Sequence, residues 1–239
     1  MTDLHLYTAA TMNGWKPLIF LEEAGLEYDL THIRFSEREQ KAPWYVALNP
    51  NGRIPTLVDH AADDFVVFES GAILWYLAER TGRFLPTDER GRSRALQWLM
   101  FQMSGVGPMM GQAMYFQRIA APHGHTDDFA ITRYVDESRR LLEVLDAQLA
   151  RHPYVAGDEY SIVDMAMYPY ARSYPWAKVS VDGLDHLQAW FDRVGSRPAV
   201  QRALQLPRPV PAFFGHGDEQ TEQRENAGRF RADAGANDG

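Results

Sequence analysis

The chain has 239 residues, of which 45 % are hydrophobic, and this is enough for one large domain or two modest ones. A formal charge of −8 argues against a general nucleic-acid binder, and the absence of cysteine excludes disulfides, thiolate metal sites and a protein-thiol nucleophile. The first ten residues do not resemble a signal peptide, and no apolar run of about 18 residues predicts a membrane span. We therefore expect a cytoplasmic protein with no nucleic-acid or membrane partner.

The first 87 residues alternate between strand and helix patterns. A strand over 4–9 is followed by a helix over 15–24, which Gly25 ends. A second strand over 28–35 follows. Two short apolar runs, 54–60 and 65–70, then predict a hairpin. The helix over 70–82 has Ser70 as its expected N-cap. The predicted order is β-α-β, then β-β-α.

The pattern becomes helical from about residue 91. One long helix is marked by apolar residues from Leu141 to Leu149 on a single face, and a later helix begins with Ser161 and Asp164 in the spacing of a capping box. We predict an α/β domain over 1–87, an all-helical domain over 91–206 and a mobile tail over 207–239, which is rich in Gly, Pro and charge.

Several motifs together resemble glutathione transferases. "LYTAATMNGWKPLIFLEEAGLEY", "NPNGRIPTLVD" and "FESGAILWYLAE" are similar to the thioredoxin-like domain of that family, and "GDEYSIVDMAMYPY" and "WFDRVGSRPAV" are similar to its helical-bundle domain. The resemblance covers roughly residues 3 to 205 and implies that fold. "TMNGWK", "QWLMFQMSGVGPMMGQ" and "ITRYVDESRRLLEVLD" resemble the nu class most, a class associated with glutathione-dependent disulfide reduction.

Thr11 and Asn13 are the candidate catalytic residues. Thr11 occupies the place of a family serine, and two readings stay open: it shapes the loop and caps the helix, or its hydroxyl donates to the glutathione sulfur. Lowering a thiol pKa of about 8.5 by ~2 units takes about 2.7 kcal/mol, which one hydrogen bond of roughly 1.5–3 kcal/mol and a helix N-terminus can supply. Asn13 is a second candidate donor. Other classes of glutathione transferase use a tyrosine for this role, and Tyr7 is the candidate here, but we interpret Tyr7 as a strand residue.

Five further positions match glutathione contacts of the family. The resemblance implies a cis Pro55 that exposes the backbone of Ile54 to the glutathione peptide. Glu69 and Ser70 precede a helix and suit the ammonium and the carboxylate of the γ-glutamyl group. Gln40 matches a nu-class contact and is otherwise an ordinary surface glutamine.

The helical region adds one candidate. Arg133 matches an arginine that reaches across to glutathione in nu-class relatives, although a lone Arg on a helix is usually solvated. The Met- and Gly-rich stretch 98–116 reads as a kinked core helix, or else as a wall for a second substrate or a subunit contact. The histidines show no ligand spacing, so we expect no metal site.

The predicted function is that of a glutathione transferase-like enzyme, most like a glutathione-dependent disulfide reductase. Glutathione, reduced or oxidised, would be the co-substrate and would supply the sulfur that the chain lacks. Two alternatives stay open: conjugation of glutathione to small electrophiles, and a non-catalytic module with the same fold. The expected partners are small disulfides or electrophiles and a second copy of the chain in a homodimer, which the apolar "QWLMFQM" helix face favours.

Overall fold

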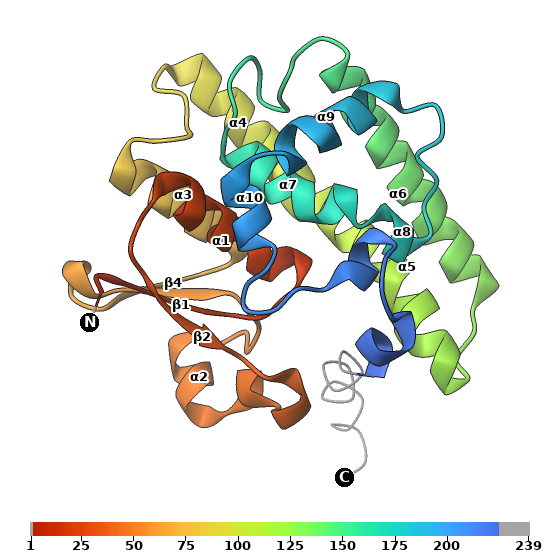
Figure 1. Cartoon of the computed structure of the whole chain (residues 1–239), viewed down its shortest axis with the longest axis horizontal. Helices are drawn as coiled ribbons and strands as arrows, with labels where there is room; N and C mark the ends of the chain where they lie inside the picture. The colour runs from red at the N-terminus through yellow and green to blue at the C-terminus, as the bar shows by residue number, and fades with distance from the viewer. Residues whose placement is uncertain (1, 225–239) are drawn as a thin grey trace.

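The computed structural model of the chain describes residues 2–224, and a four-stranded sheet forms its amino-terminal layer (Figure 1). The strands are β1 (Leu4–Thr8), β2 (Asp29–His32), β3 (Thr56–Asp59) and β4 (Phe65–Phe68). Their order is β2-β1-β3-β4, with β2 parallel to β1 and both β3 and β4 antiparallel to their neighbours. Leu6 in the middle of β1 lies opposite Leu30 on one side and Leu57 on the other. The four strands and the hairpin of β3 and β4 are those that the sequence predicted, and the order of the strands in the sheet is a finding of the structure.

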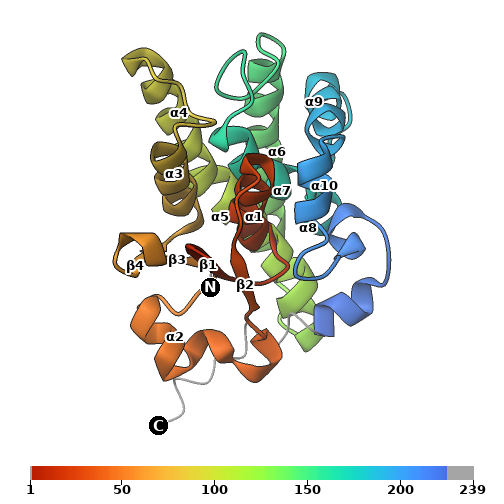
Figure 2. The same ribbon diagram turned by 60° about the vertical axis from the view of Figure 1, so that its left-hand side comes forward.

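Three helices accompany the sheet: α1 (Met12–Ala24), α2 (Pro43–Leu48) and α3 (Ser70–Thr81). Figure 2 shows α1 and α3 on one side of the sheet and α2 on the other. Gly25 ends α1 in the left-handed conformation, with φ 62°, as its position after the last periodic residue predicted. The sequence did not predict α2, because six residues are too few for a helical pattern to be recognised.

The chain continues into a helical bundle, which confirms the predicted thioredoxin-like and helical architecture. Its helices are α4 (Glu89–Phe101), α5 (Gly107–Tyr115), α6 (Asp128–Leu149), α7 (Ile162–Arg172), α8 (Tyr174–Ala177), α9 (Asp185–Gly195) and α10 (Pro198–Ala203). Two π-helical turns, Gln102–Val106 and Phe116–Ala120, flank α5. The capping box predicted at Ser161 and Asp164 is present at the start of α7.

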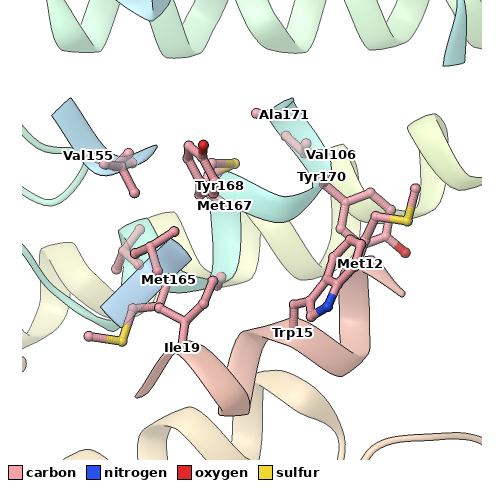
Figure 3. Packing of buried hydrophobic residues seen from close by; sticks show 14 of the residues in the cluster. Met12, Trp15, Ile19, Val106, Val155, Met165, Met167, Tyr168, Tyr170 and Ala171 are labelled. Atoms are coloured by element: carbon pink, nitrogen blue, oxygen red, sulfur yellow. The ribbon is translucent and has the colours of Figure 1, made fainter. Parts of the chain in front are cut away.

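Helix α1 joins the sheet to the bundle. Trp15 and Ile19 have no exposed surface, and Figure 3 shows them facing residues of α7, with Trp15 near Tyr170 and Ile19 near Met165. Burying a large apolar side chain stabilises the folded state by about 1.5–3 kcal/mol. Because buried residues of both halves belong to one continuous hydrophobic cluster, the start of α1 is held between the two halves.

Residues 207–224 pack against the protein, whereas the sequence predicted a mobile tail from residue 207. Val210 and Phe213 are almost fully buried, and the Phe213 and Phe214 rings lie 5.9 and 5.5 Å from the Trp15 ring, the latter stacked on it. Arg118 of the bundle forms an ion pair with Glu219. The apolar side chains in this Pro-rich segment therefore pack on the body of the protein. Residues 225–239, the rest of the predicted tail, lie outside the described residues.

Candidate functional site

The turn between β1 and α1 is built around Thr11. Its backbone is extended (φ −144°, ψ 166°), and its Oγ1 accepts a hydrogen bond from the Gly14 amide at 3.1 Å, so Thr11 caps α1. Only 2 % of Thr11 is exposed. A residue with a side chain does not fit at position 14 without a shift of the turn, because its Cβ would lie 1.9 Å from the Ala9 carbonyl oxygen. Thr11 therefore does cap the helix, and among the described residues no acceptor is recorded for its hydroxyl hydrogen, which can donate to a ligand.

Two cavities meet at Asn13, two residues after Thr11. The larger has a volume of about 590 Å³ and lies between the amino-terminal layer and the bundle, with Asn13 and Glu69 on one wall and Gln102 on the other. The smaller, of about 60 Å³, is bordered by Asn13, Gln40 and Ile54. Asn13 therefore separates a narrow polar recess from a wide chamber, and its half-buried side chain faces both.

The start of α3 forms one end of this site. Ser70 was predicted to be the N-cap, but it is the first helical residue, and Glu69 takes the cap position. Glu69 has φ 71°, a conformation that costs a residue with a side chain roughly 1–3 kcal/mol. Ser70 is 3 % exposed, and its hydroxyl donates to Asn13 Oδ1 over 3.4 Å. The left-handed turn thus brings Glu69 to the large cavity while Ser70 stays beside Asn13.

The small cavity holds the remaining candidates of the amino-terminal layer. Gln40 is 3 % exposed, and its Oε1 is buried with no hydrogen-bond partner among the described residues. Leaving a buried acceptor unpaired costs about 1–3 kcal/mol, so this oxygen is suited to a ligand donor. The Ile54–Pro55 peptide bond is cis, as the resemblance implied, and Ile54 borders the recess.

Lys16 was missed by the sequence reading. It lies one helical turn after Asn13, borders the large cavity, and is only 1 % exposed. Its Nζ donates to Gln102 Oε1 at 2.8 Å and to Ser70 Oγ at 3.3 Å. Burial lowers the pKa of Lys16 to about 7, and the nearby Glu69 carboxylate opposes this shift. A single charge in the otherwise apolar run "WKPLIFL" was the available signal.

Two other residues stand apart from these cavities. Arg133 is exposed on α6 and does not border either cavity. Tyr7, the rejected alternative, lies in β1 with its ring stacked on His5 at 4.2 Å between ring centres. Within the single chain, the structure therefore brings together Asn13, Gln40 and Ile54 with the Glu69–Ser70 turn, and it places Arg133 elsewhere.

Residues 2–224 contain neither a metal-binding cluster nor a membrane-spanning helix. In this range no group of three or more His, Asp or Glu side chains is arranged to hold a metal ion. None of the helices formed by these residues has both the length and the apolar composition needed to cross a membrane.

The family comparisons agree with this geometry. The family model "Glutathione S-transferase, N-terminal domain" matches residues 2–79, and "Glutathione S-transferase, C-terminal domain" matches residues 111–198. The chain is 41 % identical to the disulfide-bond oxidoreductase YfcG of Escherichia coli K12, over 84 % of this chain and 94 % of that protein. It is 40 % identical to the disulfide-bond oxidoreductase YghU of the same organism, over 95 % and 81 % of the two chains.

Solved structures give the same result. A glutathione transferase from Burkholderia graminis, with two glutathione molecules bound per subunit, has a TM-score of 0.81 and 39 % identity, over 87 % of this chain and 90 % of that one. A glutathione transferase from Pseudomonas putida, with one glutathione disulfide bound per subunit, also has a TM-score of 0.81 and 39 % identity, over 86 % and 92 %. The fold, both domain matches and these relatives show that the chain belongs to the glutathione S-transferase family.

Proposed function

We propose that the protein reduces small disulfides with glutathione, as expected for a nu-class member. The observation that carries this proposal is the position of Asn13, which borders both cavities. One thiol compound held in the recess and a second one in the chamber would have their sulfurs on either side of this side chain. The relatives named disulfide-bond oxidoreductases, and the solved relatives with two glutathiones or one glutathione disulfide per subunit, support the same assignment.

Glutathione would lie along the amino-terminal layer. Its peptide backbone would pair with Ile54 beside the cis Pro55, and the free Oε1 of Gln40 would accept one of its N–H groups. Its γ-glutamyl end would lie at the start of α3, with the carboxylate on Ser70 and the ammonium near Glu69. This placement sets the thiol near Thr11 and Asn13.

The reaction needs no protein thiol. The thiolate of one glutathione attacks a sulfur of the substrate disulfide, which forms a glutathione mixed disulfide and releases one substrate thiolate. A second glutathione thiolate attacks the glutathione sulfur of that mixed disulfide, and the products are glutathione disulfide and the second substrate thiol. The Thr11 hydroxyl and the Asn13 amide would donate to the sulfur of the bound glutathione. In the first step this sulfur is the attacking thiolate, and in the second step it is part of the mixed disulfide.

Paired rate measurements test this reaction type. We expect disulfide turnover to exceed conjugation of an aromatic electrophile, with uncatalysed rates subtracted. Asn13→Ala and Thr11→Ala should each lower the disulfide rate at least about tenfold while glutathione binding changes little, because a hydrogen bond to a charged sulfur matters most in the reaction. Thr11→Ser is the matched control and should keep most of the rate, since it retains the hydroxyl.

Two other outcomes would replace the proposal. Strong conjugation with negligible disulfide turnover would favour a conjugating transferase. Negligible rates in both reactions with glutathione still bound would favour a non-catalytic module. Calorimetric titration with reduced and oxidised glutathione supplies the binding measurement for both cases.

We also propose a homodimer that works in the cytoplasm, where glutathione is kept reduced. Leu96 and Met100, one turn apart on α4, are 43 % and 48 % exposed, and Phe65 on β4 is 52 % exposed. Figures 1 and 2 place α4 and β4 on the same side of the molecule. Light scattering should give twice the 27.2 kDa chain mass. Met100→Lys should shift it toward the monomer, and a monomeric wild type would contradict the proposal.

A further inference from the structure

Lys16 is a buried cation with neutral hydrogen-bond partners. An ammonium group has three N–H donors, and in Lys16 two of them reach Gln102 Oε1 and Ser70 Oγ. The third reaches the thioether sulfur of Met103 at 3.5 Å, which is a weak acceptor. The Nε2 of Gln102 is also buried without a partner among the described residues. This end of the cavity therefore has more donor capacity than strong acceptors.

The charged and titratable groups around the cavity favour an anionic ligand. Lys16 and Arg53 border the large cavity as cations, and Glu69 is the carboxylate on the same wall. Among residues 2–224, Tyr115 and Tyr170 are the other titratable residues of the lining, and the Tyr170 ring centre is 5.1 Å from Lys16 Nζ. When Lys16 is protonated, these groups carry two positive charges and one negative charge, in a chain whose formal charge is −8.

The protonation of Lys16 controls the direction of its hydrogen bond with Ser70. A protonated Lys16 can only donate, so the Ser70 oxygen accepts and the hydroxyl hydrogen points away from Lys16, toward Asn13 Oδ1. A neutral amine has a lone pair, and the Ser70 hydroxyl can then donate to it instead. Only the first arrangement leaves Ser70 as a donor to a ligand carboxylate.

We propose that protonated Lys16 is the positioning residue for the anionic end of the ligand: it orients the Ser70 hydroxyl toward a carboxylate, and carboxylate binding draws one proton onto Lys16. This inference rests on the proposed function, which places the γ-glutamyl carboxylate at Ser70. Since burial brings the pKa of Lys16 to about 7 in the ligand-free protein, a nearby carboxylate would raise that pKa and make binding proton-coupled near neutral pH.

Calorimetry with S-methylglutathione tests the coupling, because the blocked sulfur removes the thiol from the titration. At pH 7.5, buffers of different ionisation enthalpy should report uptake of roughly three quarters of a proton per site. Affinity should fall about tenfold between pH 6 and pH 8, since the proton that binding requires becomes scarcer. Lys16→Met should bind about tenfold more weakly at pH 6, with a flat pH profile and no proton uptake. The exposed Lys178→Met is the matched control and should behave as wild type.

NMR of the protein labelled with ¹³Cε-lysine observes the same event without a substitution at Lys16. The lysines of the chain are Lys16, Lys41 and Lys178, so Lys41→Met and Lys178→Met assign the Lys16 signal even if Lys16→Met does not fold. We expect its titration midpoint to rise when S-methylglutathione binds. Binding by wild type with no proton uptake and an unmoved Lys16 midpoint would overturn this inference and leave the proposed function standing. No binding of glutathione or S-methylglutathione would overturn both.

Discussion

Helices α1 and α7 pack against each other, and each begins at a hydroxyl residue whose side chain caps the first turn. Thr11 accepts from the Gly14 amide, and Ser161 accepts from the Val163 amide. The two helix starts differ at the third helical residue. In α7 this is Asp164, whose carboxylate accepts from the Ser161 amide at 3.0 Å, whereas in α1 it is Gly14, which has no side chain. The start of α7 is closed by the protein itself, and the start of α1 borders a cavity.

The starts of α7 and α1 each contain a buried ionisable residue, Asp164 and Lys16, and the two have different hydrogen-bond partners. Burial raises the pKa of Asp164 to about 6, although hydrogen bonds from Val155, Ser161 and Trp190 favour its ionised form. Burial lowers the pKa of Lys16 to about 7, and one of its contacts is only to a sulfur atom. Asp164 is satisfied inside the protein, whereas Lys16 has one weak partner and lies beside a cavity, which is consistent with the ligand role proposed for it.

The largest expected effect on stability comes from removing the Asp164 carboxylate at the start of α7. Asp164→Ala should lower the free energy of unfolding by about 3–5 kcal/mol, because it leaves the Val155 and Ser161 amides and the Trp190 indole N–H buried without an acceptor. Urea denaturation measures the loss. Asp158→Ala, at an exposed aspartate, is the control and should stay within about 0.5 kcal/mol of wild type. A similarly small effect for Asp164→Ala would show that the two helix starts do not differ.

The next effect concerns the pH dependence of stability. Between about pH 7 and the ordinary lysine pKa of 10.5, Lys16 is neutral when folded and protonated when unfolded, so the unfolded state binds more protons. Wild-type stability should therefore rise with pH relative to Lys16→Met, by at most about 1.4 kcal/mol per pH unit in this window. Urea denaturation at a series of pH values gives both curves. Lys178→Met should run parallel to wild type, and a parallel Lys16→Met curve would contradict the prediction.

The smallest effect of the three comes from the turn that keeps α1 open. Gly14→Ala should destabilise the protein by about 1–3 kcal/mol, because the new methyl group meets the Ala9 carbonyl oxygen and the turn has to shift. Gly111→Ala in α5 is the matched control. It meets no heavy atom within 4 Å and should be neutral or stabilising. Thermal melts compare the two variants, and equal shifts would mean that Gly14 has no steric role.

The start of α7 and much of the fold could be predicted from the sequence. The spacing of Ser161 and Asp164 predicted the capping box, because both partners lie within one helical turn and their hydrogen bonds are local. The strand and helix patterns likewise predicted the four strands and helices α1 and α3, but neither α2 nor the order of the strands in the sheet. The same local reasoning placed Ser70 at the N-cap of α3. This was wrong, because Glu69 takes the cap position with a positive φ, and a glutamate in the sequence does not predict that conformation.

The parts of the site that the sequence did not predict depend on contacts between distant residues. Lys16 meets Gln102 across 86 residues, so neither side chain alone identifies the pair. The Pro-rich segment after residue 206 has the composition of a tail, but Phe213 finds a buried place beside Trp15 and Trp176. Spacing reports which residues share a helix face, and it does not report which face another part of the chain will cover.

Trp15 also bears on how the protein is made. Its indole N–H donates to the Leu206 carbonyl at 2.9 Å, and the rings of Phe213 and Phe214 cover it. The ribosome adds about 5–20 residues per second, so residues 206–214 follow Trp15 by roughly 10 to 40 seconds. Until then this face of α1 lacks its final cover. A chain that ends before Leu206 would lack the Leu206 carbonyl and both phenylalanine rings, so this face of α1 would stay uncovered.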